Sequence, residues 1–146
     1  MKNRFNYFAL SALIFTIFFL LTGSLFAGIK DSTSIATVKN LDKYVNMKFT
    51  SPYSGIGTYS AGTFNGKVNG QSANFFCIDL GHSIKYNETY TDAGETSSQI
   101  TYILNNYYPF RTFPYSGSLS KVEQEAAAIQ AAIWHFSDSL NANTIE

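Results

Sequence analysis

Cys77 carries the only thiol in the sequence. A single cysteine excludes an intrachain disulfide framework and a zinc site built from several thiolates. In an exported chain a lone cysteine indicates an intermolecular bridge or a chemically active thiol, because a free thiol there is exposed to oxidation. Free cysteines are also commonly buried structural thiols. Both interpretations remain open on Cys77 alone.

Gln130 is the second residue whose chemistry does not fit its surroundings. It stands in the run Ala126 to Trp134, where every other residue is alanine, isoleucine or tryptophan. At helical spacing the amide has small and apolar neighbours one turn away. A buried amide needs a hydrogen-bond partner, so Gln130 either binds a backbone group of a sheet or points outward to solvent.

Three further polar side chains lie near these two in the sequence. A histidine can activate a thiol, so one alternative is a cysteine hydrolase that uses Cys77 with His82 or His135. A cysteine on a strand, however, lacks the helix N-terminus that commonly lowers a thiol pKa. Asp79 is expected on the same strand face as Cys77, where it either orients the site and handles protons or is an exposed carboxylate.

The N-terminal segment predicts export. Lys2 and Arg4 precede an uncharged run from residue 5 to residue 29, and small residues follow its apolar centre. This pattern is typical of a secretory signal peptide over residues 1–27. The run also suffices to cross a bilayer, which takes ~20 apolar residues, so an uncleaved anchor is the alternative. Either way, the rest of the chain is expected to be secreted or on the cell surface.

The charge of the exported part excludes some partners. The 146-residue chain has ten basic and ten acidic side chains, and removing Lys2 and Arg4 leaves eight basic against ten acidic, a net charge of −2 over residues 28–146. Nucleic acid and anionic membranes both require a basic face. We therefore expect no nucleic-acid partner and membrane contact only through the N-terminal segment.

Three strands are expected ahead of the helices. Residues 44–49 alternate apolar and polar side chains, as a half-buried strand does. Residues 58–64 and 73–80 are separated by two turn signals, Asn65-Gly66 and Asn69-Gly70, which predicts a hairpin or meander. Alternation along the last strand places the following residues on one face: Phe75, Cys77 and Asp79.

Two helices complete the expected fold. A Thr96–Gln99 capping box precedes the first helix, which Pro109 ends, and a Ser120–Glu123 capping box opens a second from Lys121 to about Ser139. The inward stripe of the second helix is Val122, Ala126, Ile129, Ile133 and Phe136. The fold class is α+β, with an antiparallel sheet or sandwich-like core and a small helical subdomain.

Three segments in this order resemble a known family. They are Phe76-Cys77-Ile78-Asp79, Tyr102 to Pro109, and Gln130-Ala131-Ala132-Ile133-Trp134. Together they resemble the internal-thioester domains of bacterial surface proteins, the Cys-Gln thioester adhesin family, over about residues 48–138. The third segment is the most specific. Ile129 departs from the family, which usually has threonine there, and the separation of Cys77 from Gln130 is short for it.

The resemblance implies a covalent adhesin rather than an enzyme. It implies a thioester between Cys77 and Gln130, formed with loss of ammonia and without metal or cofactor. An amine, such as a lysine on a host or neighbouring surface protein, would then attack Gln130 and release Cys77, in a single turnover. Trp134 and Tyr102 are expected, with Phe75 and Phe76, to shield the bond from water.

Two points stay open from the sequence. The thioester-type domain is expected over residues 28–146, and the sequence leaves open whether it is truncated at its C-terminus. A non-covalent protein- or glycan-binding module is the main alternative, because tyrosine provides contact area at low entropic cost. The tyrosines available for such a surface are Tyr53, Tyr59, Tyr86, Tyr90, Tyr107, Tyr108 and Tyr115.

Overall fold

The computed structural model describes residues 34–50, 57–91 and 94–146. The predicted signal peptide or anchor over residues 1–27, and Tyr53, lie outside these ranges. Within them, no helix is both long and apolar enough to span a bilayer.

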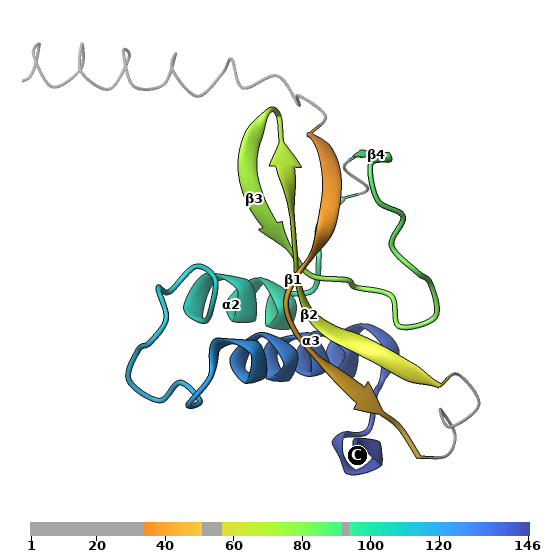
Figure 1. The fold of residues 1–146 in the computed structure, drawn as a ribbon, viewed down its shortest axis with the longest axis vertical. Coiled ribbons are helices and arrows are strands. Elements are labelled where there is room, and N and C mark those ends of the chain that lie inside the picture. The colour runs from red at the N-terminus through yellow and green to blue at the C-terminus, as the bar shows by residue number, and fades with distance from the viewer. Residues whose placement is uncertain (1–33, 51–56, 92–93) are drawn as a thin grey trace, which may run out of the picture. The chain divides into compact units, whose positions relative to one another are not determined.

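One antiparallel sheet is the centre of the fold (Figure 1). Its strands are β1 (Ile35–Lys48), β2 (Thr58–Val68), β3 (Gln71–Phe75) and β4 (Thr89–Thr91), in the spatial order β3-β2-β1-β4. With the helices described below, this confirms the α+β class. The described residues form one sheet, without a second sheet to complete a sandwich. β3 is an edge strand that pairs only with β2.

The hairpin between β2 and β3 turns at one of the two predicted sites. Asn69 and Gly70 both have positive φ, 51° and 84°, as a two-residue hairpin turn requires. Asn65-Gly66, the other predicted turn, lies instead inside β2, so that prediction was wrong. A Cβ on Gly66 would lie 2.1 Å from the Thr37 carbonyl oxygen and 2.8 Å from the Phe75 ring. The glycine therefore allows close packing rather than a turn.

Both predicted helices form, but neither begins with its predicted capping box. α2 (Ser98–Asn106) is capped by Ser97, whose hydroxyl accepts a hydrogen bond from the Ile100 N–H at 3.3 Å, one residue beyond the predicted Thr96. α3 (Val122–Asp138) has no side-chain cap. The Ser120 hydroxyl donates to the Gln124 side chain at 3.3 Å instead of capping the helix.

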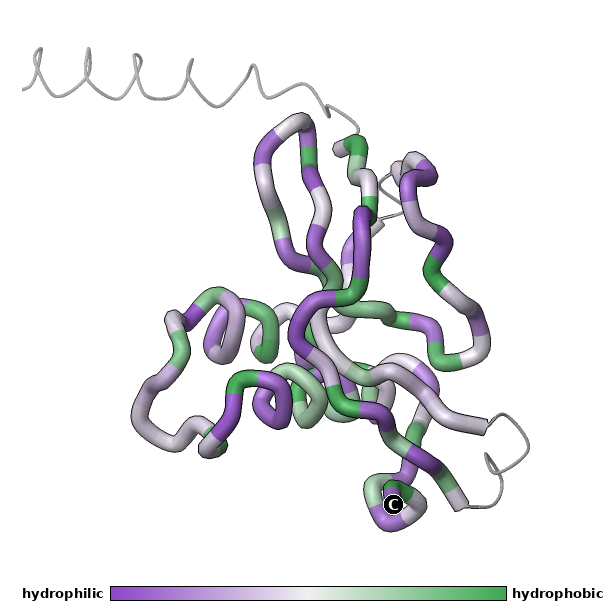
Figure 2. Tube along the Cα trace, viewed as in Figure 1, coloured by the Kyte–Doolittle hydropathy of each residue, from purple (hydrophilic) through white to green (hydrophobic). Residues whose placement is uncertain are grey.

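α3 is buried on two sides and holds the core together. One hydrophobic cluster joins it to the sheet, and the other joins it to α2, which lies beside it (Figures 1 and 2). The first cluster comprises Phe49, Ala61, Leu80, Ala127, Trp134 and Leu140. The second comprises Ile100, Ile103, Ile129 and Ile133. Phe136, predicted to face inward, is 47% exposed, because the helix also turns the Ala127 and Trp134 side toward the core.

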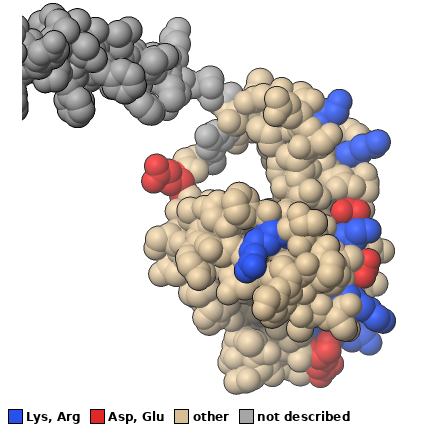
Figure 3. Space-filling model, turned by 90° about the vertical axis from the view of Figure 1, so that its left-hand side faces the viewer, with Lys and Arg blue, Asp and Glu red and all other residues tan. Residues whose placement is uncertain are grey.

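The C-terminal residues pair with the end of β1. After the short 3-10 helix η2 (Ala142–Thr144), Ile145 forms an isolated antiparallel bridge with Phe49, and the Glu146 N–H donates to the Lys48 carbonyl at 2.8 Å. On the face of the molecule in Figure 3, charged side chains lie mainly along one edge, and most of that face is uncharged.

Candidate functional site

Cys77 lies just beyond the sheet, in an irregular turn. β3 ends at Phe75, so the predicted strand to Leu80, with Phe75, Cys77 and Asp79 on one face, was wrong. The reason is that both backbone polar groups of Cys77 are bound by the Gln130 side chain. They are therefore not available to extend the ladder of β3.

The Gln130 amide and the Cys77 backbone form a reciprocal pair. The Gln130 Oε1 accepts from the Cys77 N–H at 3.0 Å, and the Gln130 Nε2 donates to the Cys77 carbonyl oxygen at 2.6 Å. Gln130 is 0% exposed. Of the two interpretations open from the sequence, the structure shows the amide turned inward onto a backbone group. The two residues, 53 positions apart, are thereby brought into direct contact.

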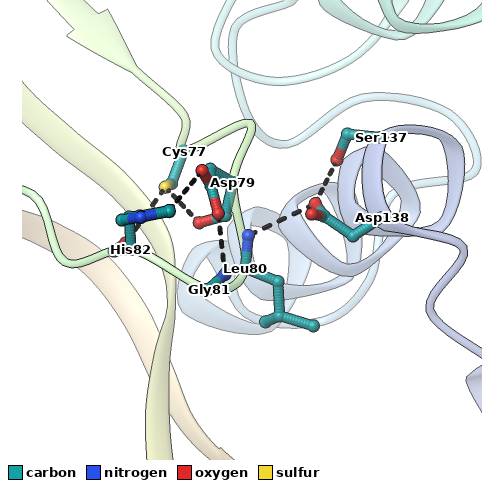
Figure 4. Close-up of polar contacts among 7 residues, drawn as sticks. All are labelled: Cys77, Asp79, Leu80, Gly81, His82, Ser137 and Asp138. Carbon is teal, nitrogen blue, oxygen red and sulfur yellow. Dashed lines mark hydrogen bonds and ion pairs between the residues drawn. The ribbon is translucent and has the colours of Figure 1, made fainter.

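A second contact from α3 holds the other end of the same turn. The Asp138 carboxylate accepts from the Leu80 N–H at 3.2 Å and from the Ser137 hydroxyl at 2.6 Å (Figure 4). Gln130 and Asp138 are about two helical turns apart on α3. The turn from Cys77 to Leu80 is thus fixed at both ends to one helix, which positions the sulfur relative to the Gln130 amide.

The thiol of Cys77 is partly buried. Its Sγ donates to the Asp79 carbonyl oxygen at 3.0 Å, and the His82 carbonyl oxygen lies 4.0 Å away. Burial is the largest influence on the Cys77 thiol and raises its pKa, and the negative charges of Asp79 and Asp138 raise it further; the Asp79 backbone and the nearby indole N–H of Trp134 act in the opposite direction. That indole N–H is buried without a hydrogen bond of normal geometry, so its action on the sulfur is weak. The thiol is therefore protonated rather than activated.

Asp79 and His82 form a hydrogen-bonded pair beside the sulfur. The Asp79 Oδ2 lies 2.6 Å from the His82 Nδ1, and Oδ1 accepts from the Gly81 N–H at 2.8 Å (Figure 4). The hydrogen bond from His82 lowers the pKa of the Asp79 carboxyl. Asp79 thus orients a neighbouring side chain, and it acts on Cys77 through its backbone carbonyl rather than across a strand face.

Two cavities flank Cys77, with volumes of about 310 and 320 Å³. Cys77, Asp79 and His82 line both of them. The first extends past Phe75 and Phe76, and the second past Tyr59 and Trp134. Small molecules can therefore approach the sulfur from two sides.

Of the aromatic residues expected to shield the site, one lies elsewhere. Trp134 is buried in the sheet-facing cluster, against which Cys77 packs. Phe76 packs on the cluster between the two helices. Tyr102 is 61% exposed and lines a separate groove between α2 and α3, so its predicted role as a shield was wrong.

The second histidine does not reach the site. The His135 Nδ1 lies 2.8 Å from the Leu140 carbonyl oxygen, just after the end of α3, and its ring contacts Phe136. It has no contact with Cys77. In the described part of the chain, no three His, Cys, Asp or Glu side chains are close enough together to hold a metal ion.

Sequence reasoning missed Asp138 and the main-chain role of Leu80. Asp138 stands near the end of the second predicted helix and belongs to none of the motifs singled out in the sequence. Its spacing of eight from Gln130 was the available signal, because residues at that separation share a helix face.

The comparisons with known proteins agree with this site. No curated protein and no solved structure gives a match. A family profile, described as "Thioester domain", matches residues 74–146, which are 73 of the 146 residues and include both Cys77 and Gln130. With the profile covering half of its length, the chain belongs to the thioester-domain family.

Proposed function

We propose that Cys77 and Gln130 form the internal thioester of this domain, and that it reacts with amines on a host or neighbouring surface protein. The observation that carries the proposal is the reciprocal pairing of the fully buried Gln130 amide with the Cys77 backbone. A structural glutamine would need only some polar partner. Here the partner is the residue that carries the only thiol in the sequence.

The pairing suits formation of the bond. The Cys77 sulfur attacks Cδ of Gln130, the C–N bond breaks, and the thiol proton leaves with the nitrogen as ammonia. The Cys77 N–H, 3.0 Å from the Gln130 Oε1, can stabilise the negative charge that develops on that oxygen. The departing Nε2 lies against the Cys77 carbonyl oxygen, which orients the amide for attack.

The resulting thioester is a stored electrophile. A thiolate leaves more readily than an amide nitrogen, so an incoming amine can acylate at Gln130 and release Cys77. The product is an amide bond to the partner. Because the bond is used once, the protein is a covalent binder and not a catalyst. Thioester domains typically occur on extracellular or surface proteins, which supports a secreted or surface location.

The thiol environment favours this function over a cysteine hydrolase. A hydrolase needs an activated thiolate, whereas burial raises the pKa of the Cys77 thiol. His135, one of the two candidate partners of the thiol, lies 2.8 Å from the Leu140 carbonyl oxygen beyond the end of α3 and does not contact Cys77. The non-covalent binding module remains a possible outcome of the test below.

Intact mass of the purified protein tests the proposal. We expect a mass lower by one ammonia than the sequence requires, and a gain of one methylamine after treatment with that amine. Cys77→Ala and Gln130→Ala should each abolish both effects. An unmodified mass in freshly purified, folded protein would refute the thioester and favour the binding module.

A further inference from the structure

We propose that His82, oriented by Asp79, carries the proton during amine transfer at Cys77. It takes the proton from the attacking nitrogen and delivers it to the departing sulfur. This inference rests on the proposed thioester and adds a catalytic group to its reaction with amines.

The hydrogen bond to Asp79 fixes which nitrogen of the imidazole is free. An ionised carboxylate only accepts hydrogen bonds, so the 2.6 Å contact with the Asp79 Oδ2 requires a proton on the His82 Nδ1. In the neutral ring the Nε2 then holds a lone pair. The His82 side chain is 85% exposed, and that of Asp79 is 49% exposed. The lone pair is therefore accessible to a molecule that enters from solvent.

The position of the ring matches both ends of the proton transfer. His82 lines both cavities that reach Cys77. Its backbone carbonyl oxygen is 4.0 Å from the Cys77 sulfur, and Figure 4 shows the imidazole beside that sulfur. A nucleophile that enters either cavity therefore lies near both Cys77 and His82, which line it. The Asp79 carboxylate is held in turn by the Gly81 N–H at 2.8 Å, which fixes the orientation of the pair.

The reaction requires a group that first accepts and then donates a proton. The amine nitrogen becomes acidic as it bonds to the thioester carbon, so a base must remove a proton at that point. The sulfur then leaves into a partly buried site, where burial disfavours the thiolate. A neutral imidazole can perform both transfers, because its unprotonated ring nitrogen accepts a proton and can release it again.

The complete step balances. The neutral amine forms a C–N bond to Cδ of Gln130, and its proton passes to the His82 Nε2. The C–S bond breaks with its electron pair on sulfur, and the proton on Nε2 moves to the Cys77 sulfur. The products are a secondary amide at Gln130, a thiol at Cys77 and a neutral imidazole.

The charged groups around the site favour an amine over other nucleophiles. Among the described residues that line the two cavities, Asp79 is the only carboxylate, and none is lysine or arginine. Asp138 on α3 adds a second negative charge near Cys77. The next charged groups along the chain, Lys85 and Glu88, lie 3.8 Å apart and form an exposed pair of opposite sign. The local field therefore attracts an ammonium group, which releases one proton to solvent to give the neutral amine that attacks.

The test measures the rate of thioester opening by methylamine in full-length wild type and three variants. His82→Gln keeps a polar side chain that cannot carry the proton, and Asp79→Asn removes the orienting charge. Ser83→Ala is the matched control, because Ser83 lines the same two cavities. Intact mass first establishes that each protein has lost one ammonia. Rates are then followed by mass in water and in deuterium oxide.

We expect His82→Gln to retain the thioester and to open about 10²-fold more slowly, at the lower end of what general acid–base catalysis contributes. Asp79→Asn should slow opening by a smaller factor, and Ser83→Ala should open at the wild-type rate. The wild-type thioester should open more slowly in deuterium oxide than in water, and His82→Gln should lose this difference. Replacing a purely structural residue would leave the isotope effect unchanged.

Three results would overturn the proposal. The first is a His82→Gln thioester that opens at the wild-type rate. The second is a wild-type opening rate that is the same in water and in deuterium oxide. This result refutes the proposal even if His82→Gln fails to fold. The third is a wild-type protein of unmodified mass; it refutes the proposed function as well, and it is recognised before any rate is measured.

Discussion

A bond between Cys77 and Gln130 should stabilise the folded domain, and opening it with methylamine should reverse that effect. The bond joins residues 53 positions apart in the chain. A covalent link of this kind restricts the unfolded chain more than the folded one, because the folded state already holds both residues in contact. The expected perturbation is therefore lower stability without a change of fold.

The size of the effect follows from the length of the closed loop. The chain-entropy relation for a cross-link over 53 positions gives about 4 kcal/mol at 25 °C. Forming the thioester also removes the Gln130 nitrogen, and with it the hydrogen bond to the Cys77 carbonyl. The methylamide restores one such donor, worth about 1 kcal/mol. The net loss on opening is about 3 kcal/mol.

Urea unfolding of the same preparation before and after methylamine treatment measures this loss. With a denaturant slope of about 2 kcal/mol per molar urea, the midpoint should fall by about 1.5 M. Cys77→Ala is the matched control: it lacks the thioester but keeps the backbone atoms that pair with Gln130. Methylamine should leave its midpoint unchanged.

An opened protein with the same or a higher midpoint than the closed form, with opening verified by mass, would refute this reasoning. It would mean that the bond strains the folded state by as much as it restricts the unfolded chain, or that the unfolded chain already keeps the two segments together.

Three further predictions concern the unlinked structure. Gln130→Ala should be less stable than Cys77→Ala by about 2–4 kcal/mol in urea unfolding. Only the change at Gln130 leaves the Cys77 N–H and carbonyl unpaired and opens a cavity, so equal stabilities would contradict the observed pairing. Gly66→Ala should cost about 1–3 kcal/mol, since the added Cβ meets the Thr37 carbonyl oxygen and the Phe75 ring, whereas Ser72→Ala on the exposed part of β3 should be near neutral by the same assay. Burial is the larger cause that raises the pKa of Tyr115, and the hydrogen bond to the Glu125 carboxylate raises it further, to about 12. The pKa of a tyrosine in the unfolded chain is ~10. The stabilisation that Tyr115 contributes should therefore be fully present below pH ~10 and be lost as the pH rises toward 12. Tyr115→Phe should remove that part of the pH dependence of the free energy of unfolding.

The sequence alone determined the elements and the residue types of the site. The Asn69-Gly70 turn, the two helices and the α+β class follow from local patterns of turn residues and apolar spacing, and the structure confirms them. The pairing of a lone cysteine with an amide in an alanine-rich helix was also visible, through the order of the motifs. These features depend on residues close together in the chain, where local propensity and periodicity are informative.

The tertiary structure decided where each element ends and what faces the sulfur. Alternation predicted that the strand would continue to Leu80, but the Gln130 side chain binds the Cys77 backbone and ends the ladder at Phe75. Periodicity likewise could not show that Phe136 stays exposed, because it does not reveal that α3 packs on two neighbours. Asp138 and the Asp79–His82 pair belong to the site only because α3 and the turn after β3 meet in space. A contact between residues more than fifty positions apart depends on packing, and no local pattern in the sequence encodes it.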